Sequence, residues 1–116
     1  MNIEQLDANL NEAILTGKAM EAYETYYTEG VVMQENDAAP TVGKDANRQR
    51  ELAFFSSIEQ FHGASVLSTA AGGNITSSEW EMDVTFKGGH RVKWTQAVVR
   101  RWQDGQIAAE RFYYGK

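Results

Sequence analysis

The most suggestive acidic side chain is that of Glu110, which lies close to the end of the chain among apolar residues. The strand pairing predicted between residues 80 and 114 places this carboxylate on one sheet face with four apolar side chains, those of Trp80, Met82, Val84 and Phe112. A carboxylate in such surroundings ionises at a higher pH than in water, so it could act as a general base. The alternative is a structural ion pair with Arg101, its diagonal neighbour on that face.

Three tyrosines at helical spacing, Tyr23, Tyr26 and Tyr27, could supply a phenol that polarises a substrate carbonyl group. We predict Tyr23 as this donor, and Tyr26 and Tyr27 as walls of a pocket. The alternative interpretation assigns two of these three rings to the core or to the pocket wall.

The other titratable candidates carry less specific signals. Lys93 could bind an anionic ligand group or extend into water, and Glu35 is a second carboxylate candidate. His62 opposite Asp83 resembles a catalytic dyad, but both are predicted on the outer sheet face, where a cross-strand charge pair is the simpler interpretation. With two histidines, no cysteine and no legible ligand spacing, we predict neither a metal nor a cofactor.

Two glycine-containing turns define the strands that carry Glu110. Gly88-Gly89 and Asp104-Gly105 favour two-residue hairpins, because these residues tolerate a positive φ. Counting outward pairs Trp80 with Ala97, and Thr95 with Tyr114. It also puts Lys93 and Thr95 on the inner face with Glu110.

The segments before these strands have helical or short extended patterns. We predict a first helix over 3–14 with Asn2 as its N-cap, a second over 19–27 stopped by Gly30, and a third over 46–57 whose Phe54 and Phe55 enter the core. A small hairpin pairs 31–35 with 41–42. A long strand over 59–71 carries Leu67, Ser65, Gly63 and Phe61 on the inner face beside Trp80, Met82 and Val84, and a strand of this length commonly contains a bulge. Helices and strands are segregated along the chain, which predicts an α+β fold with a pocket between the two layers.

Length and composition limit the class of protein. The 116 residues suit a single domain spanning 1–116, and a net charge of −5 without a basic face argues against nucleic-acid binding. No segment has the length of a membrane span or the pattern of a secretion signal, so we expect a cytoplasmic protein without membrane contact.

The order of these elements, with the closing string Arg101-Trp102-Gln103-Asp104-Gly105-Gln106-Ile107 and the aromatic strand after it, resembles the SnoaL-like branch of the nuclear transport factor 2-like superfamily. The Gly43-Lys44-Asp45-Ala46 and Glu79-Trp80-Glu81 segments add to the likeness. The resemblance implies a cone in which three N-terminal helices cover a curved antiparallel or mixed sheet, with a deep pocket and often a dimer. Family enzymes often carry a carboxylate five residues after Ile107, a position that Phe112 holds here, and a terminal Asp that Gly115 replaces.

We therefore predict a pocket for a small, mostly apolar molecule with one or two polar groups. The predicted lining is Tyr26, Tyr27, Phe54, Phe61, Trp80, Met82, Val84, Lys93, Thr95, Phe112 and Tyr114. The leading hypothesis is an isomerase, cyclase or hydrolase with Glu110 as base and a tyrosine as donor; the alternative is a non-catalytic binding or sensing domain.

The opposite face of the sheet predicts a homodimer. The register gathers a contiguous apolar patch there, consisting of Val92, Trp94, Val98, Trp102, Ile107 and Tyr113. A monomer rarely exposes so large an apolar area, so a second copy is expected to cover it. The alternative is that a twisted sheet folds the patch under the N-terminal helix.

Overall fold

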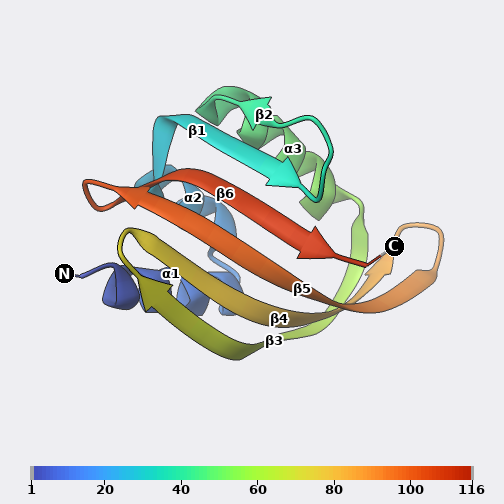
Figure 1. Ribbon diagram of the computed structural model, residues 1–116. Helices are drawn as coiled ribbons and strands as arrows, with labels where there is room; N and C mark the ends of the chain where they lie inside the picture. The colour runs from blue at the N-terminus through green and yellow to red at the C-terminus, as the bar shows by residue number, and fades with distance from the viewer. Residues whose placement is uncertain (1, 116) are drawn as a thin grey trace.

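The computed structural model describes residues 2–115, in which three helices pack against one side of a curved sheet (Figure 1). The helices are α1 (Ile3–Leu15), α2 (Ala19–Tyr26) and α3 (Lys44–Ser56), and the strands are β1 (Tyr27–Glu35), β2 (Thr41–Val42), β3 (Ile58–Gly72), β4 (Ile75–Phe86), β5 (His90–Gln103) and β6 (Gln106–Tyr114). The strand order is β2-β1-β6-β5-β4-β3, with β1 parallel to β6 and the other neighbours antiparallel. The predicted α+β class, with three N-terminal helices over a curved mixed sheet, is confirmed.

The ends of α1 follow from local sequence. The side chain of Asn2 accepts a hydrogen bond from the backbone N–H of Gln5 at 2.9 Å, as an N-cap should. Gly17 adopts a φ of 82° just past the helix, a conformation that glycine reaches without steric strain. Both features were predicted.

The second helix ends earlier than predicted. α2 stops at Tyr26, Tyr27 is already extended, and Gly30 lies inside β1 rather than at a helix end. The reason is tertiary: Tyr27 pairs with Ile107 of β6, and this strand pairing competes with the helical periodicity that continues through Tyr27.

The small hairpin is confirmed, and α3 begins two residues before the predicted start. Phe55, predicted in the core with Phe54, is 40% exposed. Val32 pairs with Val42 and Met33 with Thr41, while Gly43 turns into α3 with a φ of 101°. The first turn of α3 buries Lys44, whose ammonium donates to the backbone oxygen of Tyr27 at 2.9 Å.

A buried amide connects α3 to this hairpin. Nδ2 of Asn47, which has no exposed surface, donates to the carbonyl oxygens of Val31, Thr41 and Gly43 at 2.9–3.2 Å. The carbonyl oxygens of Val31 and Gly43 also accept backbone N–H groups, from Gly43 at 2.8 Å and from Asn47 at 3.1 Å. The side-chain amide of Asn47 therefore adds a second donor to each of them and holds the hairpin against the helix.

We expect Asn47→Ala to lower the free energy of unfolding by about 2–3 kcal/mol, because it removes the three hydrogen bonds that the fully buried amide donates. Urea denaturation followed by circular dichroism measures the change. Gln49→Ala, on the exposed side of the same helix, is the matched control and should stay within about 0.5 kcal/mol of the parent. Equal effects of the two variants would contradict this role for Asn47.

The turn between β4 and β5 differs from the prediction by one residue. Phe86 pairs with His90, so the loop contains Lys87 as well as Gly88 and Gly89, and Trp80 pairs with Gln96 instead of Ala97. Because side chains alternate along a strand, this one-residue change exchanges the inner and outer faces of β5 up to Arg101.

A bulge in the next hairpin restores the original phase. The Asp104-Gly105 turn has two residues, as predicted, with φ values of 51° and 80°. The register then shifts between Arg101 and Trp102, so that Arg100 pairs with Glu110 and Val98 with Phe112. A bulge adds one residue to one strand, and here it cancels the displacement made by the longer loop.

The prediction was therefore right for β4 and β6 and wrong for most of β5. Lys93 and Thr95 were predicted on the inner face but lie on the outer one, because they pair with Asp83 and Glu81 rather than with the inward-facing β4 residues. Lys93 forms a solvent-exposed salt bridge with Glu81 at 3.6 Å. Neither side chain lines the cavity beneath the sheet.

The same correction removes the predicted dimer patch. Val98, Trp102 and Ile107 are at most 3% exposed, and Trp102 and Ile107 join Leu10, Tyr23 and Tyr27 in the core under the first two helices. Val92 and Trp94 line a cavity, and of the six only Tyr113 remains largely exposed, at 42%. Most of these residues are covered within the protein, as in the alternative in which the sheet folds the patch under the N-terminal helix.

The edge strand β3 contains the irregularities predicted for its length. Its register to β4 shifts at three places, one of them between Val66 and Ser68. Phe61 lines the cavity on the inner face, as predicted, and pairs with Val84, whereas Val66 rather than Leu67 stands opposite Trp80, and Leu67 is exposed. Bulges of this kind also discourage pairing of an exposed edge with another chain. Within residues 2–115, no helix combines the length and the hydrophobicity that crossing a bilayer requires.

Candidate functional site

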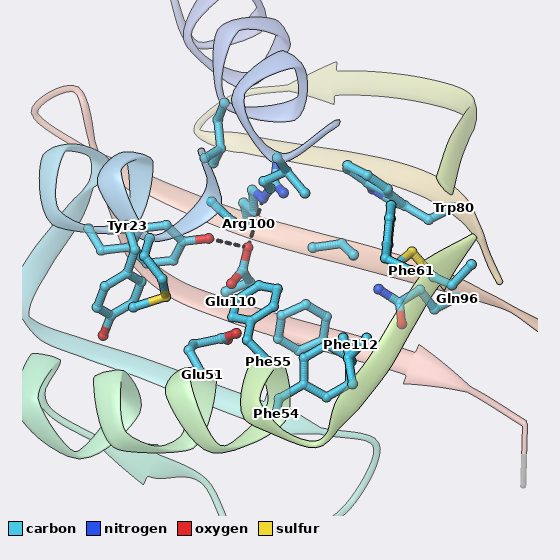
Figure 2. Close-up of a pocket in the computed structure, with 18 of the residues that line it drawn as sticks. Tyr23, Glu51, Phe54, Phe55, Phe61, Trp80, Gln96, Arg100, Glu110 and Phe112 are labelled. Atoms are coloured by element: carbon cyan, nitrogen blue, oxygen red, sulfur yellow. Dashed lines mark hydrogen bonds and ion pairs between the residues drawn. The ribbon is translucent and has the colours of Figure 1, made fainter. Parts of the chain in front are cut away.

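A cavity in two adjoining chambers lies between the helices and the inner face of the sheet (Figure 2). The inner chamber has a volume of about 160 Å³ and reaches under α1 and α2; the outer one has about 450 Å³ and lies between α3 and the ends of β5 and β6. Five side chains line both chambers: Glu51, Phe54, Trp94, Gln96 and Phe112. A ligand spanning the two would therefore pass these residues.

Most residues predicted for the pocket lie on its walls. The inner chamber is lined by Tyr23, Tyr27, Phe54, Phe61, Trp80, Met82, Glu110 and Phe112, and the outer one by Tyr114. Trp80, Met82, Glu110 and Phe112 share this chamber, as the strand pairing required. Tyr26 and the fully buried Val84 do not reach either chamber.

Glu110 is held in a buried ion pair, but its partner is Arg100 rather than Arg101. The carboxylate Oε2 accepts from Nε of Arg100 at 2.8 Å and from the hydroxyl of Tyr27 at 2.7 Å. Arg101 is exposed, because the three-residue loop before β5 turns Arg100 inward, and the bulge at Ala108 of β6 places Glu110 opposite Arg100. Because both donors occupy Oε2 of Glu110, the geometry does not suit its predicted role as the base.

The other side of Arg100 is bound by α1. Nη1 donates to Oδ1 of Asp7 at 2.7 Å and to Oδ1 of Asn11 at 2.6 Å. Asp7 in turn accepts from the hydroxyl of Thr76 at 2.8 Å, so the network joins α1 to β4, β5 and β6. Burial alone lowers the pKa of Arg100, but the negative charge of Glu110 holds that pKa above its ordinary value.

Both tyrosine hydroxyls in the inner chamber donate hydrogen bonds to other groups of the protein. Tyr23 donates to the backbone oxygen of Lys44 at 2.8 Å, and burial raises its pKa to about 12. Burial, and then the charge of Glu110, raise the pKa of Tyr27 well above 10. Neither phenol directs its proton into the cavity, so the predicted donor role of Tyr23 has no support from its geometry.

Glu51 is the carboxylate that the sequence analysis missed. It projects from α3 into the cavity, lines both chambers, and forms no ion pair or hydrogen bond with the described residues 2–115 (Figure 2). Burial, and then the charge of Glu110, raise the pKa of Glu51 to about 7. The available signal was its spacing: Lys44, Asn47, Glu51 and Phe54 follow one another at helical intervals along the inward stripe of α3.

The remaining titratable candidates form hydrogen bonds or ion pairs outside the inner chamber. Glu35, at the outer chamber, binds Arg50 and accepts from the hydroxyl of Tyr114 at 2.8 Å. Nε2 of His62 lies 2.7 Å from the hydroxyl of Thr85, so His62 does not form the dyad considered with Asp83. The pKa of Asp83 lies below its ordinary value, mainly because of Arg91 and in smaller part because of His62, across the strands. Among residues 2–115, no three His, Asp or Glu side chains are grouped as they would be to hold a metal ion.

Comparison with known proteins identifies the class to which this fold belongs. Residues 1–114 match the family described as the SnoaL-like domain. The chain therefore belongs to the SnoaL-like domain family of the nuclear transport factor 2-like superfamily, as the sequence resemblance indicated. Among curated proteins, no sequence matches this chain significantly.

Solved structures with the same fold include enzyme-like and uncharacterised proteins. A protein from Mesorhizobium loti, provisionally named a SnoaL-like polyketide cyclase, is 27% identical with a TM-score of 0.88, over 98% of this chain and 100% of that one. A nuclear transport factor 2-like protein of unknown function from Burkholderia pseudomallei is 13% identical with a TM-score of 0.84, over 97% and 89% of the two chains. A protein from Catenulispora acidiphila with a ketosteroid isomerase-like fold, solved with trimethylamine, is 16% identical with a TM-score of 0.77, over 93% and 84%.

Proposed function

We propose that this protein is an acid–base enzyme acting on a small, mostly apolar molecule, with Glu51 as the group that accepts and returns a proton. The observation that carries the proposal is the unpaired carboxyl of Glu51 in an aromatic cavity, with a pKa of about 7. Near neutral pH such a group is present in both protonation states, so it can take a proton in one step and return it in the next. Perturbed carboxyls in clefts often mark active sites.

Glu110 supports this role through its charge. Arg100 and Tyr27 hold its Oε2, and, after burial, the charge of Glu110 contributes to the raised pKa of Glu51. Two carboxyls in different surroundings thus have separate tasks, one bound to Arg100 and Tyr27 and the other unpaired.

The residues of the cavity walls indicate the general type of substrate. Phe54, Phe61, Trp80, Trp94 and Phe112 provide aromatic surface, which favours a compact ring or a short hydrocarbon skeleton. This chemistry fits the isomerase, cyclase or hydrolase hypothesis, with Glu51 replacing Glu110 as the reacting carboxyl.

We expect Glu51→Gln to lower turnover of a small probe substrate by about 10²-fold or more, because the amide cannot accept the proton. Two probes separate the reaction types: cyclohexanone in D₂O, whose α-hydrogen exchange is followed by NMR, and cyclohexene oxide, whose hydrolysis is followed by gas chromatography. Glu59→Gln, an exposed change on β3, is the matched control and should leave both rates unaltered. Turnover that survives Glu51→Gln would refute the proposal.

A non-catalytic binding function is the second candidate. The fixed anion of Glu110 and the aromatic walls could hold a small organic cation, and the Catenulispora acidiphila protein was solved with trimethylamine. Saturable binding of trimethylammonium by tryptophan fluorescence, together with no Glu51-dependent turnover of either probe, would favour this function over catalysis.

A further inference from the structure

One amide in the cavity has a fixed orientation. Nε1 of Trp94 lies 2.9 Å from Oε1 of Gln96, and because an indole nitrogen can only donate, the atom facing it must be the amide oxygen. The amide nitrogen Nε2 of Gln96 consequently faces away from Trp94, and it makes no hydrogen bond to any residue in the described range 2–115. It is a donor without a protein partner.

This donor and the proposed base reach the same space from opposite layers. Gln96 projects from β5 and Glu51 from α3, and each lines both chambers. Figure 2 shows the two polar groups apart from one another, with aromatic rings of the wall between and around them. A molecule occupying the junction of the chambers can therefore present one atom to the carboxyl and another to the amide.

Other hydroxyl and indole donors on the wall are used within the protein. Tyr23 donates to Lys44 and Tyr27 to Glu110, while the indole of Trp80 donates to Oγ of Ser78 at 2.8 Å. Nε2 of Gln96 thus remains available to an oxygen atom of a ligand in the two chambers that Glu51 also lines.

We infer that the substrate is a carbonyl compound with an acidic α-hydrogen, and that Gln96 is a catalytic residue whose Nε2 donates to the carbonyl oxygen. The inference rests on the proposed role of Glu51. Glu51 takes the α-proton, the C–H electron pair forms a C=C bond, and the carbonyl becomes an enolate oxygen that accepts from Gln96. Return of the proton from Glu51 to a different carbon completes an isomerisation, and return of a deuteron that the carboxyl has taken from D₂O in place of that proton completes an exchange. Neither needs an oxidant.

The amide donor stabilises the enolate more than the neutral carbonyl, because negative charge develops on the oxygen only during the reaction. Trp94 acts as a positioning residue, since its indole N–H holds the oxygen end of the amide away from the substrate. An oxygen end turned toward the enolate would repel it.

The first test measures α-hydrogen exchange of cyclohexanone in D₂O. We expect Gln96→Met, which keeps the length and loses the donor, to lower kcat by about 10²-fold with a smaller change in KM. Trp94→Phe should lower kcat less, because it releases the amide without removing it. Gln103→Met, an exposed change on the same strand, is the control and should have no effect.

The second test detects the donor without turnover. Glu51→Gln imitates the protonated base, so this variant should bind 4-nitrophenolate, a stable analogue of an enolate, at pH 8. Adding Gln96→Met should weaken that binding by about tenfold or more, measured by the absorbance of the bound phenolate and by calorimetry.

The outcomes separate this inference from the proposed function. If exchange requires Glu51 but is unchanged in Gln96→Met, the role of Gln96 is wrong while the base remains. Glu51-dependent hydrolysis of cyclohexene oxide without any exchange of cyclohexanone would likewise overturn only the carbonyl substrate. Absence of phenolate binding by Glu51→Gln, or binding that does not depend on Gln96, would count against the inference even if neither probe reacts.

Discussion

Arg100→Leu should lower the free energy of unfolding by about 3–5 kcal/mol, the largest effect expected from a single substitution in this chain. The guanidinium is 2% exposed and binds the buried carboxylates of Asp7 and Glu110 from its two ends. Without it, both carboxylates remain enclosed beside one another with no compensating charge. Chemical denaturation in urea at pH 7 measures the loss, and a variant too unstable to fold at 25 °C would also agree with it.

The neighbouring arginine is a matched control. Arg101→Leu changes the same side chain one position along β5, but Arg101 is exposed on the outer side of the sheet. Its effect should stay within about 0.5 kcal/mol. Comparable destabilisation by the two variants would mean that the ion-pair network is not the source of the loss, and would also question the β4–β5 register that turns Arg100 inward.

Glu51→Gln should stabilise the protein at pH 8 by about 3 kcal/mol, in contrast to the loss that most buried substitutions cause. Burial raises the pKa of Glu51 from an ordinary 4.5 to about 7 in the folded protein. A group with a raised folded pKa contributes its stability in full below pH 4.5 and loses it as the pH rises through 7. At pH 8 the parent protein holds an unfavourable buried anion, and the neutral amide removes it.

The pH dependence identifies the cause. Below pH 4.5 the parent carboxyl is protonated, so the stabilities of the parent and Glu51→Gln should converge, and most of the difference should develop between pH 5 and 7. Thermal unfolding over pH 4–8 gives the curve, with Glu59→Gln as a surface control. A pH-independent difference would show that the change in packing, rather than the ionisation of Glu51, is responsible.

Gain of stability combined with loss of turnover would support a functional role for Glu51. An enclosed carboxyl destabilises the fold when it is unpaired, and Glu51 makes no hydrogen bond or ion pair with residues 2–115 that would explain its presence. Stability and activity often conflict at such positions, because the properties that a reaction requires are unfavourable for folding. Asn47 is the contrasting case on the same helix, because its buried amide makes three hydrogen bonds that stabilise the hairpin.

Features governed by neighbouring residues were predictable from the sequence. The Asn2 cap, the stop at Gly17 and the Asp104-Gly105 turn depend on the dihedral preferences and local hydrogen bonds of a few adjacent residues. The order of elements also sufficed for the α+β class and the SnoaL-like family. Trp80, Met82, Glu110 and Phe112 were correctly placed on one face, although two compensating changes in β5 lay between them.

Features governed by residue counts between strands were decided by the tertiary structure. A loop of three residues instead of two after Phe86 exchanged the faces of β5, and the bulge after Arg101 reversed the exchange. Arg100 instead of Arg101, and Gln96 instead of Lys93, entered the interior as a result. The physical reason is that strand side chains alternate with a period of two, so one inserted residue inverts a face while changing the local sequence signal very little.

The lack of an ion-pair partner for Glu51 among residues 2–115 likewise could not be predicted from the sequence. Its spacing with Asn47 and Phe54 indicates the inward side of α3, but whether a carboxyl there meets an arginine depends on side chains delivered by other elements. Arg100 is taken by Asp7, Asn11 and Glu110, and Arg50 is taken by Glu35. Helix periodicity determined that Glu51 points inward from α3. Only the packing of α1 and the sheet decided that it has no ion-pair partner among residues 2–115, because the nearby guanidinium groups of Arg100 and Arg50 are bound by other carboxylates.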